Sequence, residues 1–209
     1  MNEMRERTKE HFPTVLLTLL SIVQALALEL LWSHLGDAPH LFAVSWPALL
    51  SWIQVGTTFL GIVLVWVVYA SNVMRFSWVP TTTDSVMPFL IGLLEFTLVE
   101  TLGPDTLGIW LVVMAALVGI MHWIAHATMR RARLDADNEP FFRNRQPATL
   151  GDFYLPMASV AGLFLAGLYL FTSGDQGVVA LFALFATTSL LAGQFFVTAR
   201  FWESSVADR

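Results

Sequence analysis

Six stretches of mostly apolar residues follow one another along the chain, separated by short polar segments. They cover residues 12–32, 52–74, 86–102, 106–127, 154–171 and 178–199. The hydrocarbon core of a bilayer is roughly 30 Å thick, so an α-helix rising 1.5 Å per residue needs about 20 apolar residues to cross it. The pattern therefore predicts an all-α integral membrane protein, a single bundle of six transmembrane helices.

The segments between these stretches refine the prediction. Residues 38–51 are apolar but are interrupted by Pro39 and Pro47, so we expect an interfacial or re-entrant segment before the second span. At the third span, Asp84 or Ser85 is expected to cap the helix, with Pro88 in its first turn. The longest connection, residues 128–153, is a polar loop, and no segment is long enough for a separate soluble domain.

The basic residues predict the orientation. All 11 lysines and arginines fall in the N-terminal tail 1–11, after the second stretch, in the loop 128–153 or in the C-terminal tail 200–209. These segments share one side of a six-span bundle, and cytoplasmic loops carry an excess of Lys and Arg. We therefore expect both termini in the cytoplasm, and the compact chain favours a bacterial cytoplasmic membrane.

The composition excludes several functions. The chain is 56% hydrophobic and 13% charged, and its net charge of −5 comes without the basic stripe that nucleic-acid binding needs. It has no cysteine, so thiolate chemistry and disulfides are excluded. It also lacks a nucleophile-elbow motif, a zinc-protease motif and a glycine-rich phosphate loop. We expect no enzyme activity, no cofactor and no metal site.

Five ionisable residues fall inside the predicted spans: Glu29, Glu95, Glu100, His122 and His126. Such groups are costly in hydrocarbon and are candidates for function. Glu95 lies nearest the middle of a span, where we expect it to be protonated or paired. It is either a proton or cation site, or a neutral carboxyl that hydrogen-bonds a neighbouring helix. Glu29 and Glu100 lie nearer the outer boundary, where snorkelling to the interface is the alternative.

The two histidines are four residues apart and share one helix face. This spacing suits two metal ligands, but no third ligand accompanies them, so a protonatable relay or two ordinary interfacial histidines remain the alternatives. The same face continues through Gly119, Ala115 and Gly108. A face of small residues is expected to pack closely against another helix or to line a polar path.

Polar and small residues within the other spans mark further contact faces. Glutamines inside a bundle favour a polar interior and are ion-path candidates, and small residues repeating every four positions favour close helix approach, within the chain or between subunits of a homo-oligomer. The glutamines are Gln24, Gln54 and Gln194, and the small residues are Ala158, Gly162 and Ala166.

The loop 128–153 holds five arginines that are candidates for binding lipid headgroups or a partner protein: Arg130, Arg131, Arg133, Arg143 and Arg145. An ordinary positively charged cytoplasmic loop is the alternative. Two functions follow from these residues. The first is a channel or transporter that moves a proton or a monovalent cation through a polar interior. The second is a non-catalytic scaffold, sensor or assembly factor that acts through the arginine-rich loop.

Overall fold

The computed structural model describes residues 3–207, and this part of the chain contains helices and turns but no strand. Its long helices are α1 (Glu3–Asp37), α2 (Trp46–Arg75), α3 (Thr82–Glu100), α4 (Leu107–Arg133), α6 (Tyr154–Ser173) and α7 (Val178–Ala207). The shorter ones are α5 (Glu139–Phe142) and the 3-10 turns η1 (Pro39–Phe42), η2 (Pro104–Thr106), η3 (Ala136–Asn138) and η4 (Leu150–Phe153). Six helices are long and apolar enough to cross a membrane, which confirms the all-α prediction.

The second helix begins earlier than its apolar stretch predicts. Ser45 caps α2 by accepting a hydrogen bond from the backbone N–H of Ala48, and Pro47 lies in the first turn, where a missing N–H costs little. Residues 46–51 of the segment expected to be interfacial are therefore the start of α2 itself. Only η1 remains as a separate turn between α1 and α2.

The third helix also begins earlier than expected. Thr81, not Asp84 or Ser85, is its N-cap, and Asp84 completes a capping box by accepting a hydrogen bond from the Thr81 backbone N–H at 2.7 Å. Because the helix begins at Thr82, Pro88 lies inside it and not in its first turn. The proline removes the N–H that would bond the carbonyl of Asp84.

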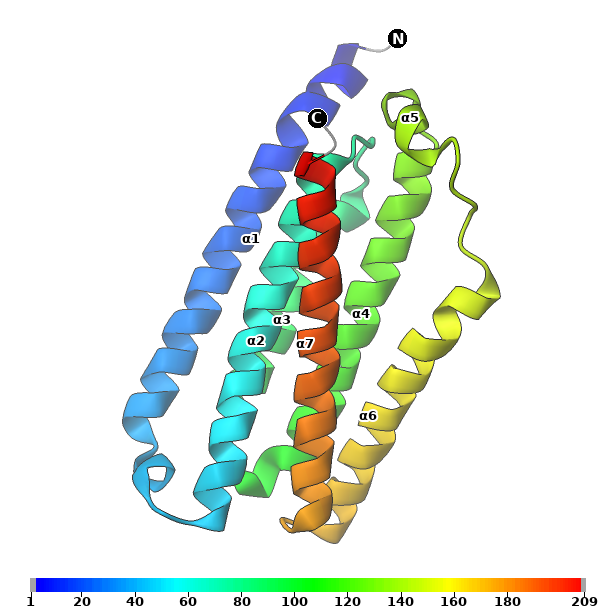
Figure 1. The fold of residues 1–209 in the computed structure, drawn as a ribbon. Coiled ribbons are helices and arrows are strands. Elements are labelled where there is room, and N and C mark those ends of the chain that lie inside the picture. Colours follow the sequence, from blue (N-terminus) through cyan, green and yellow to red (C-terminus); the bar gives the residue numbers. More distant parts are fainter. Residues whose placement is uncertain (1–2, 208–209) are drawn as a thin grey trace.

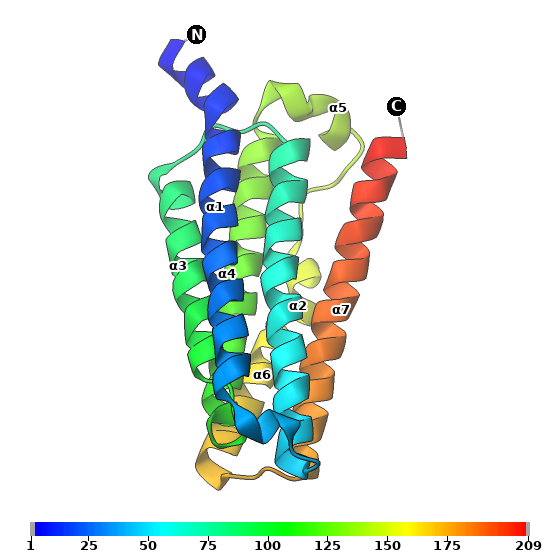
Figure 2. The same cartoon turned by 90° about the vertical axis from the view of Figure 1, so that its left-hand side faces the viewer.

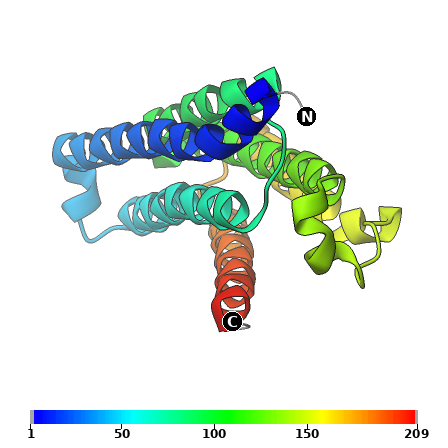
Figure 3. The same cartoon turned by 90° about the horizontal axis from the view of Figure 1, so that it is seen from above.

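The six long helices form a closed ring of contacts, in which α1 packs on α2 and α3, α3 on α4, α4 on α6, α6 on α7, and α7 on α2. Figure 3 shows α2 and α4 lying between the α1/α3 pair and the α6/α7 pair. About half of the apolar window is buried in α2 (56%) and α4 (50%), against 17% in α6 and 22% in α7. The central helices are therefore α2 and α4, and α6 and α7 are peripheral.

Both ends of the described chain lie at the same end of the bundle as α5 (Figure 1). The long helices run roughly along one common direction, as Figure 2 shows from the side. The α6 helix ends at Gly174, whose φ of 64° is left-handed and whose N–H bonds the carbonyl of Leu170. From this turn α6 and α7 separate, so that they are far apart at the end that carries the termini (Figures 1 and 3).

Glycines set the distance between α4 and α6. A Cβ atom added to Gly167 would lie 2.8 Å from the backbone oxygen of Gly108 and 2.9 Å from Val112, so the two helix backbones are nearly in contact. A Cβ on Gly119 would lie 3.6 Å from Val160 of α6. The predicted close packing of the small-residue face of α4 is therefore confirmed, and α6 is its partner.

The small residues Ala158, Gly162 and Ala166 do not make this contact. Ala158 and Gly162 are exposed, and a Cβ on Gly162 would meet nothing within 4 Å, while Ala166 is half-buried against the core. The face of α6 that meets α4 instead carries Gly167. A contact of the Ala158 and Gly162 face with another subunit stays a prediction.

We expect Gly167→Ala to destabilise the protein and Gly162→Ala to leave it unchanged or slightly more stable. The first change forces backbone to move at the α4–α6 contact, at a cost of about 1 to 3 kcal/mol. The second adds a methyl group to open space and gains helix propensity of up to about 1 kcal/mol. Thermal unfolding of the two purified variants in detergent measures the difference, and equal unfolding temperatures would contradict this account of the contact.

Candidate functional site

Glu95, near the middle of α3, is fully buried and pairs with Gln24 of α1. The Gln24 Nε2 atom lies 2.9 Å from each of the two carboxyl oxygens of Glu95. The exposed fraction is 0% for Glu95 and 5% for Gln24, so both groups are removed from the surface. The sequence identified both residues as candidates, but only the packing of α1 on α3 brings them together.

The other end of the Gln24 amide has no partner. Its Oε1 atom is buried and makes no hydrogen bond among the described residues, which is a costly arrangement for a carbonyl oxygen. In this orientation the Gln24 amide donates to both carboxyl oxygens, which suits a charged carboxylate. If the amide group were rotated by 180°, its Oε1 would accept a hydrogen bond from the O–H of a protonated carboxyl. The same pair can therefore satisfy Glu95 in either protonation state.

The remaining carboxylate and glutamine candidates lie elsewhere. Glu29 and Glu100 are exposed on their helices. Gln54 of α2 is buried and holds the α3–α4 turn, since its Oε1 accepts the N–H of Gly103 at 3.0 Å and its Nε2 donates to the carbonyl of Thr101 at 3.3 Å. Both the oxygen and the nitrogen of the Gln54 amide are therefore hydrogen-bonded in joining α2 to the α3–α4 turn. In Gln24 only the amide nitrogen is hydrogen-bonded.

The two histidines of α4 have different surroundings. His122 is half-buried, and its Nδ1 lies 2.8 Å from the carbonyl oxygen of Val118 one turn earlier. His126 is exposed and meets the ring of Phe153 edge to face at 4.8 Å. Within residues 3–203, no group of three His, Asp or Glu side chains is placed to hold a metal ion.

A small cavity lies among α1 to α4 near the start of α3, and the sequence analysis missed it. Tyr69, Asn72, Asp84 and Thr128 contribute polar groups to its wall. Trp78 also lines it, and its buried indole N–H has no hydrogen-bond partner in the described part of the chain. We call this space the inner cavity. Of its polar residues, only Asp84 had been noticed in the sequence, and it was noticed as a helix cap.

Asp84 also pairs with one of the loop arginines. Arg131 Nη2 donates to Asp84 Oδ1 at 2.5 Å, and Nη1 donates to Thr81 at 3.2 Å. Asp84 is buried, so this ion pair joins the start of α3 to the end of α4 with little exposure to solvent. Arg131 therefore pairs with groups of the same chain, whereas Arg130 next to it is exposed.

The other loop arginines differ in the same way. Arg133 donates to backbone carbonyls at residues 145 and 146 and lies 4.7 Å from the ring centre of Phe142. Arg145 lies 4.1 Å from the ring centre of Phe141. Arg143 makes a long, exposed ion pair within α5 and its flank. Cation–π contacts and hydrogen bonds thus fold this loop on itself.

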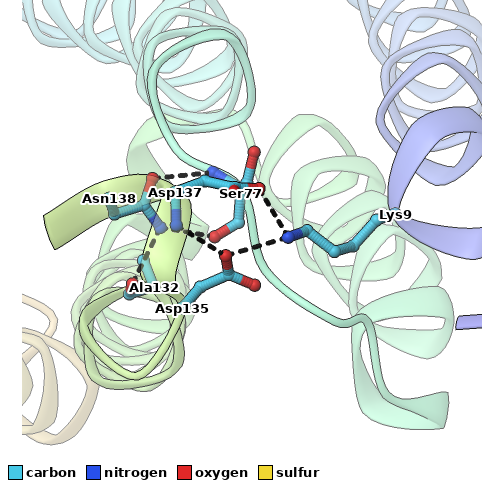
Figure 4. A network of polar contacts seen from close by, with 6 residues as sticks. All are labelled: Lys9, Ser77, Ala132, Asp135, Asp137 and Asn138. Atoms are coloured by element: carbon cyan, nitrogen blue, oxygen red, sulfur yellow. Dashed lines mark hydrogen bonds and ion pairs between the residues drawn. The ribbon is translucent and has the colours of Figure 1, made fainter. Parts of the chain in front are cut away.

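A polar network ties α1 to the α4–α5 connection (Figure 4). Lys9 Nζ lies 2.8 Å from Asp135 and 2.6 Å from Asp137, while Asn138 donates to the carbonyl of Ser77 and accepts its N–H. The hydrogen bonds to Asp135 and Asp137 raise the pKa of Lys9. Burial acts to raise the pKa of Asp135, but the hydrogen bond from Lys9 and further favourable contacts outweigh it and lower that pKa.

No protein-family model, no curated protein and no solved structure matches this chain. The candidate site therefore rests on the geometry of the chain itself.

We expect Lys9→Met to lower the stability by about 1 to 2 kcal/mol, because it removes two charge-assisted hydrogen bonds from a largely buried ammonium group. The pKa of Lys9 is raised above 10.5 and that of Asp135 is lowered below 3.8. The stabilisation is therefore complete between these two values. It is lost as pH falls through the lowered pKa of Asp135 or rises through the raised pKa of Lys9.

Unfolding temperatures of wild type and Lys9→Met between pH 5 and 9 measure this difference. Arg7→Met is the matched control, because Arg7 makes only an exposed pair with Glu3, a kind of pair worth about 0.3 to 0.5 kcal/mol. A Lys9→Met difference that changed strongly within this pH range would contradict the assignment.

Proposed function

We propose that this chain is an integral membrane protein of the bacterial cytoplasmic membrane, with all six long helices spanning it and both termini in the cytoplasm, and that it transports a small ion. We further propose that this ion is a proton and that Glu95 binds it. The observation that carries the proposal is the pairing of a fully buried carboxyl group with a single amide, Gln24, in the middle of an apolar bundle.

Membrane insertion is supported by the outer faces of the peripheral helices. Large apolar side chains such as Phe164, Phe182 and Phe196 are 47% to 70% exposed. Continuous exposed apolar surface of this kind is unfavourable in water and is ordinary in lipid.

The orientation is supported by the distribution of charge. The described basic residues lie in the first turns of α1, at the end of α2, in the last turn of α4 and the connection after it, and near the end of α7. These places share the end of the bundle that carries both termini and α5 (Figure 1). A single basic end fits the excess of positive residues on the cytoplasmic side of membrane proteins.

A proton suits Glu95 better than a monovalent cation does. A metal cation would need several oxygen ligands around it, as the preference of hard cations for oxygen-rich sites requires. Glu95 instead faces an N–H donor, and the buried Gln24 oxygen is the remaining acceptor of the pair. A proton needs no such set of oxygen ligands, and the Gln24 amide can hydrogen-bond the carboxyl group in both its protonated and its deprotonated form.

The scaffold alternative receives less support from the loop that it would use. Arg131, Arg133 and Arg145 contact carboxylates, carbonyls or rings of the same chain. Of the five arginines, Arg130, Arg143 and Arg145 are exposed, and Arg145 also contacts the ring of Phe141. The loop therefore offers a partner a smaller basic surface than five free arginines would.

The test is proton flux into proteoliposomes under an imposed membrane potential, with wild type and Glu95→Gln compared side by side. We expect flux in the wild type and its loss in the variant, because glutamine keeps the size and hydrogen bonding of the side chain but cannot bind and release a proton. Glu6→Gln is the control, since Glu6 is exposed in the first turns of α1 and should retain the wild-type flux.

Two results would count against the proposal. A correctly folded wild type that passes no protons would remove the transport function, and the exposed arginines of the loop would then become the place to look for a partner. Undiminished flux through Glu95→Gln would leave transport standing but would exclude Glu95 as its proton-binding group.

A further inference from the structure

A second cavity, separate from Glu95, lies between α2, α4 and α7. It is a groove of about 600 Å³, counting its open side, and we call it the α2–α4–α7 groove. Its lining residues lie in the middle parts of α2, α4 and α7.

The wall of the groove is apolar except at two side chains. Leucines, valines, methionines, an alanine and Gly61 form most of the lining, and the polar members are His122 of α4 and Gln194 of α7. On α4 the lining extends from Met114 to Ala125, which is about 16 Å at 1.5 Å per residue. Such a surface suits an extended apolar chain.

His122 presents a hydrogen-bond acceptor. A backbone carbonyl can only accept, so the contact of Nδ1 with the carbonyl of Val118 requires Nδ1 to carry the proton. In the neutral imidazole the other nitrogen, Nε2, then has a free lone pair. Because Val118 belongs to the same helix, α4 itself determines that Nε2 is the ring nitrogen left to accept a hydrogen bond from a ligand.

Gln194 presents both a donor and an acceptor. Gln194 is exposed, and its side-chain amide makes no hydrogen bond among residues 3–203 within a predominantly apolar lining. In lipid, an exposed and unpaired amide is unfavourable and is relieved by a polar partner. The Gln194 amide and the His122 acceptor together suit a hydroxyl group, which can accept a hydrogen bond from the amide and donate one to His122.

We propose that the α2–α4–α7 groove binds a single-chain amphipathic lipid whose polar end is a hydroxyl group, with the chain along α4 and the hydroxyl between His122 and Gln194. The site depends on the proposed membrane insertion, which gives such a molecule access from the side. It does not depend on Glu95, which is not among the residues that line the groove.

Gly61 offers a way to fill the groove. A Cβ added there would lie 3.7 Å from Leu191 and 3.8 Å from Met114, in ordinary contact, so a larger side chain would extend into the lined space. Gly56, on the same helix, is exposed and a Cβ there would meet nothing within 4 Å. Gly61→Leu and Gly56→Leu thus make the same chemical change inside and outside the groove.

The experiment uses purified protein in lipid nanodiscs and a photoactivatable hexadecanol with a diazirine in its chain. After illumination, mass spectrometry of peptides locates the labelled residues, and unlabelled hexadecanol competes for specific sites. We expect competed labelling on the groove faces of α4 and α7. Gly61→Leu should reduce it about tenfold, equivalent to about 1.4 kcal/mol, and Gly56→Leu should not.

A second comparison tests the polar end. The methyl ether of the same probe cannot donate a hydrogen bond to the acceptor on His122. We expect the wild type to prefer the alcohol by about three- to tenfold and His122→Phe to lose this preference. Glu95→Gln should label like the wild type, which separates failure of this proposal from failure of the proton-transport proposal.

Three outcomes would overturn the inference. Labelling spread evenly around the helices, or unchanged in a folded Gly61→Leu protein, would show that the groove does not select the chain. Equal labelling by alcohol and ether in the wild type would remove the role of the hydroxyl. A dimer that Gly61→Leu dissociates, together with an unlabelled groove, would assign the groove to a second copy of this chain.

Discussion

Polar groups inside an apolar bundle must find their partners on neighbouring helices, and the rest of this structure depends on how they do so. Trp110 of α4 donates its indole N–H to Thr58 of α2 at 3.0 Å. Thr57 of α2 meets Thr188 of α7 at 2.6 Å. Because a buried unpaired group costs more than a paired one gains, these contacts fix which helices are neighbours and at what rotation.

The pair formed by Gln24 and Glu95 follows the same rule only in part. The amide satisfies the carboxyl, but its own oxygen is left over. Elsewhere in the bundle, Gln54 uses both ends of its amide on the α3–α4 turn and holds the backbone still. The incomplete pairing of Gln24 distinguishes it from Gln54, and it is the reason why Glu95 is proposed to bind a proton.

Division of the bundle into two halves separates the two proposed sites. The tightly packed half, α1 to α4, contains Glu95 and the inner cavity. The other half is held by glycine contacts between α4 and α6 and by the packing of α7 on α2, and it opens where α6 and α7 diverge. The groove and the inner cavity share Val68, Met121 and Ala125 as a common wall.

At the end of the bundle that carries the termini, ion pairs join the helices, whereas apolar packing joins them in the interior. Asp84 with Arg131 joins α3 to α4, and Lys9 joins α1 to the connection after α4. Lys9, Asp84 and Asp135 have low exposure, so their pairs are worth more than ordinary surface pairs, whereas Asp137 is exposed. The pair with Asp84 also explains why Arg131 is held within the protein.

The sequence by itself determined the class of the molecule and its six long helices, because hydrophobicity over some 20 residues is a local property that needs no knowledge of neighbours. It also identified Glu95, Gln24 and His122 as unusual, since polar groups in apolar stretches are visible one at a time. The exact helix starts at Trp46 and Thr82 were missed because Ser45 and Thr81 act as caps at the polar margins of the apolar stretches.

Tertiary structure alone decided which of these groups meet. Gln24 and Glu95 are separated by 71 positions, and Lys9 and Asp135 by 126. Helix rotation decided that Gly167, and not Gly162 of the predicted small-residue pattern, contacts α4. The inner cavity and the α2–α4–α7 groove are spaces between helices, and their lining residues come from several segments. Periodicity gives the faces of one helix but not the partner of each face, because that choice depends on the packing of all six helices at once.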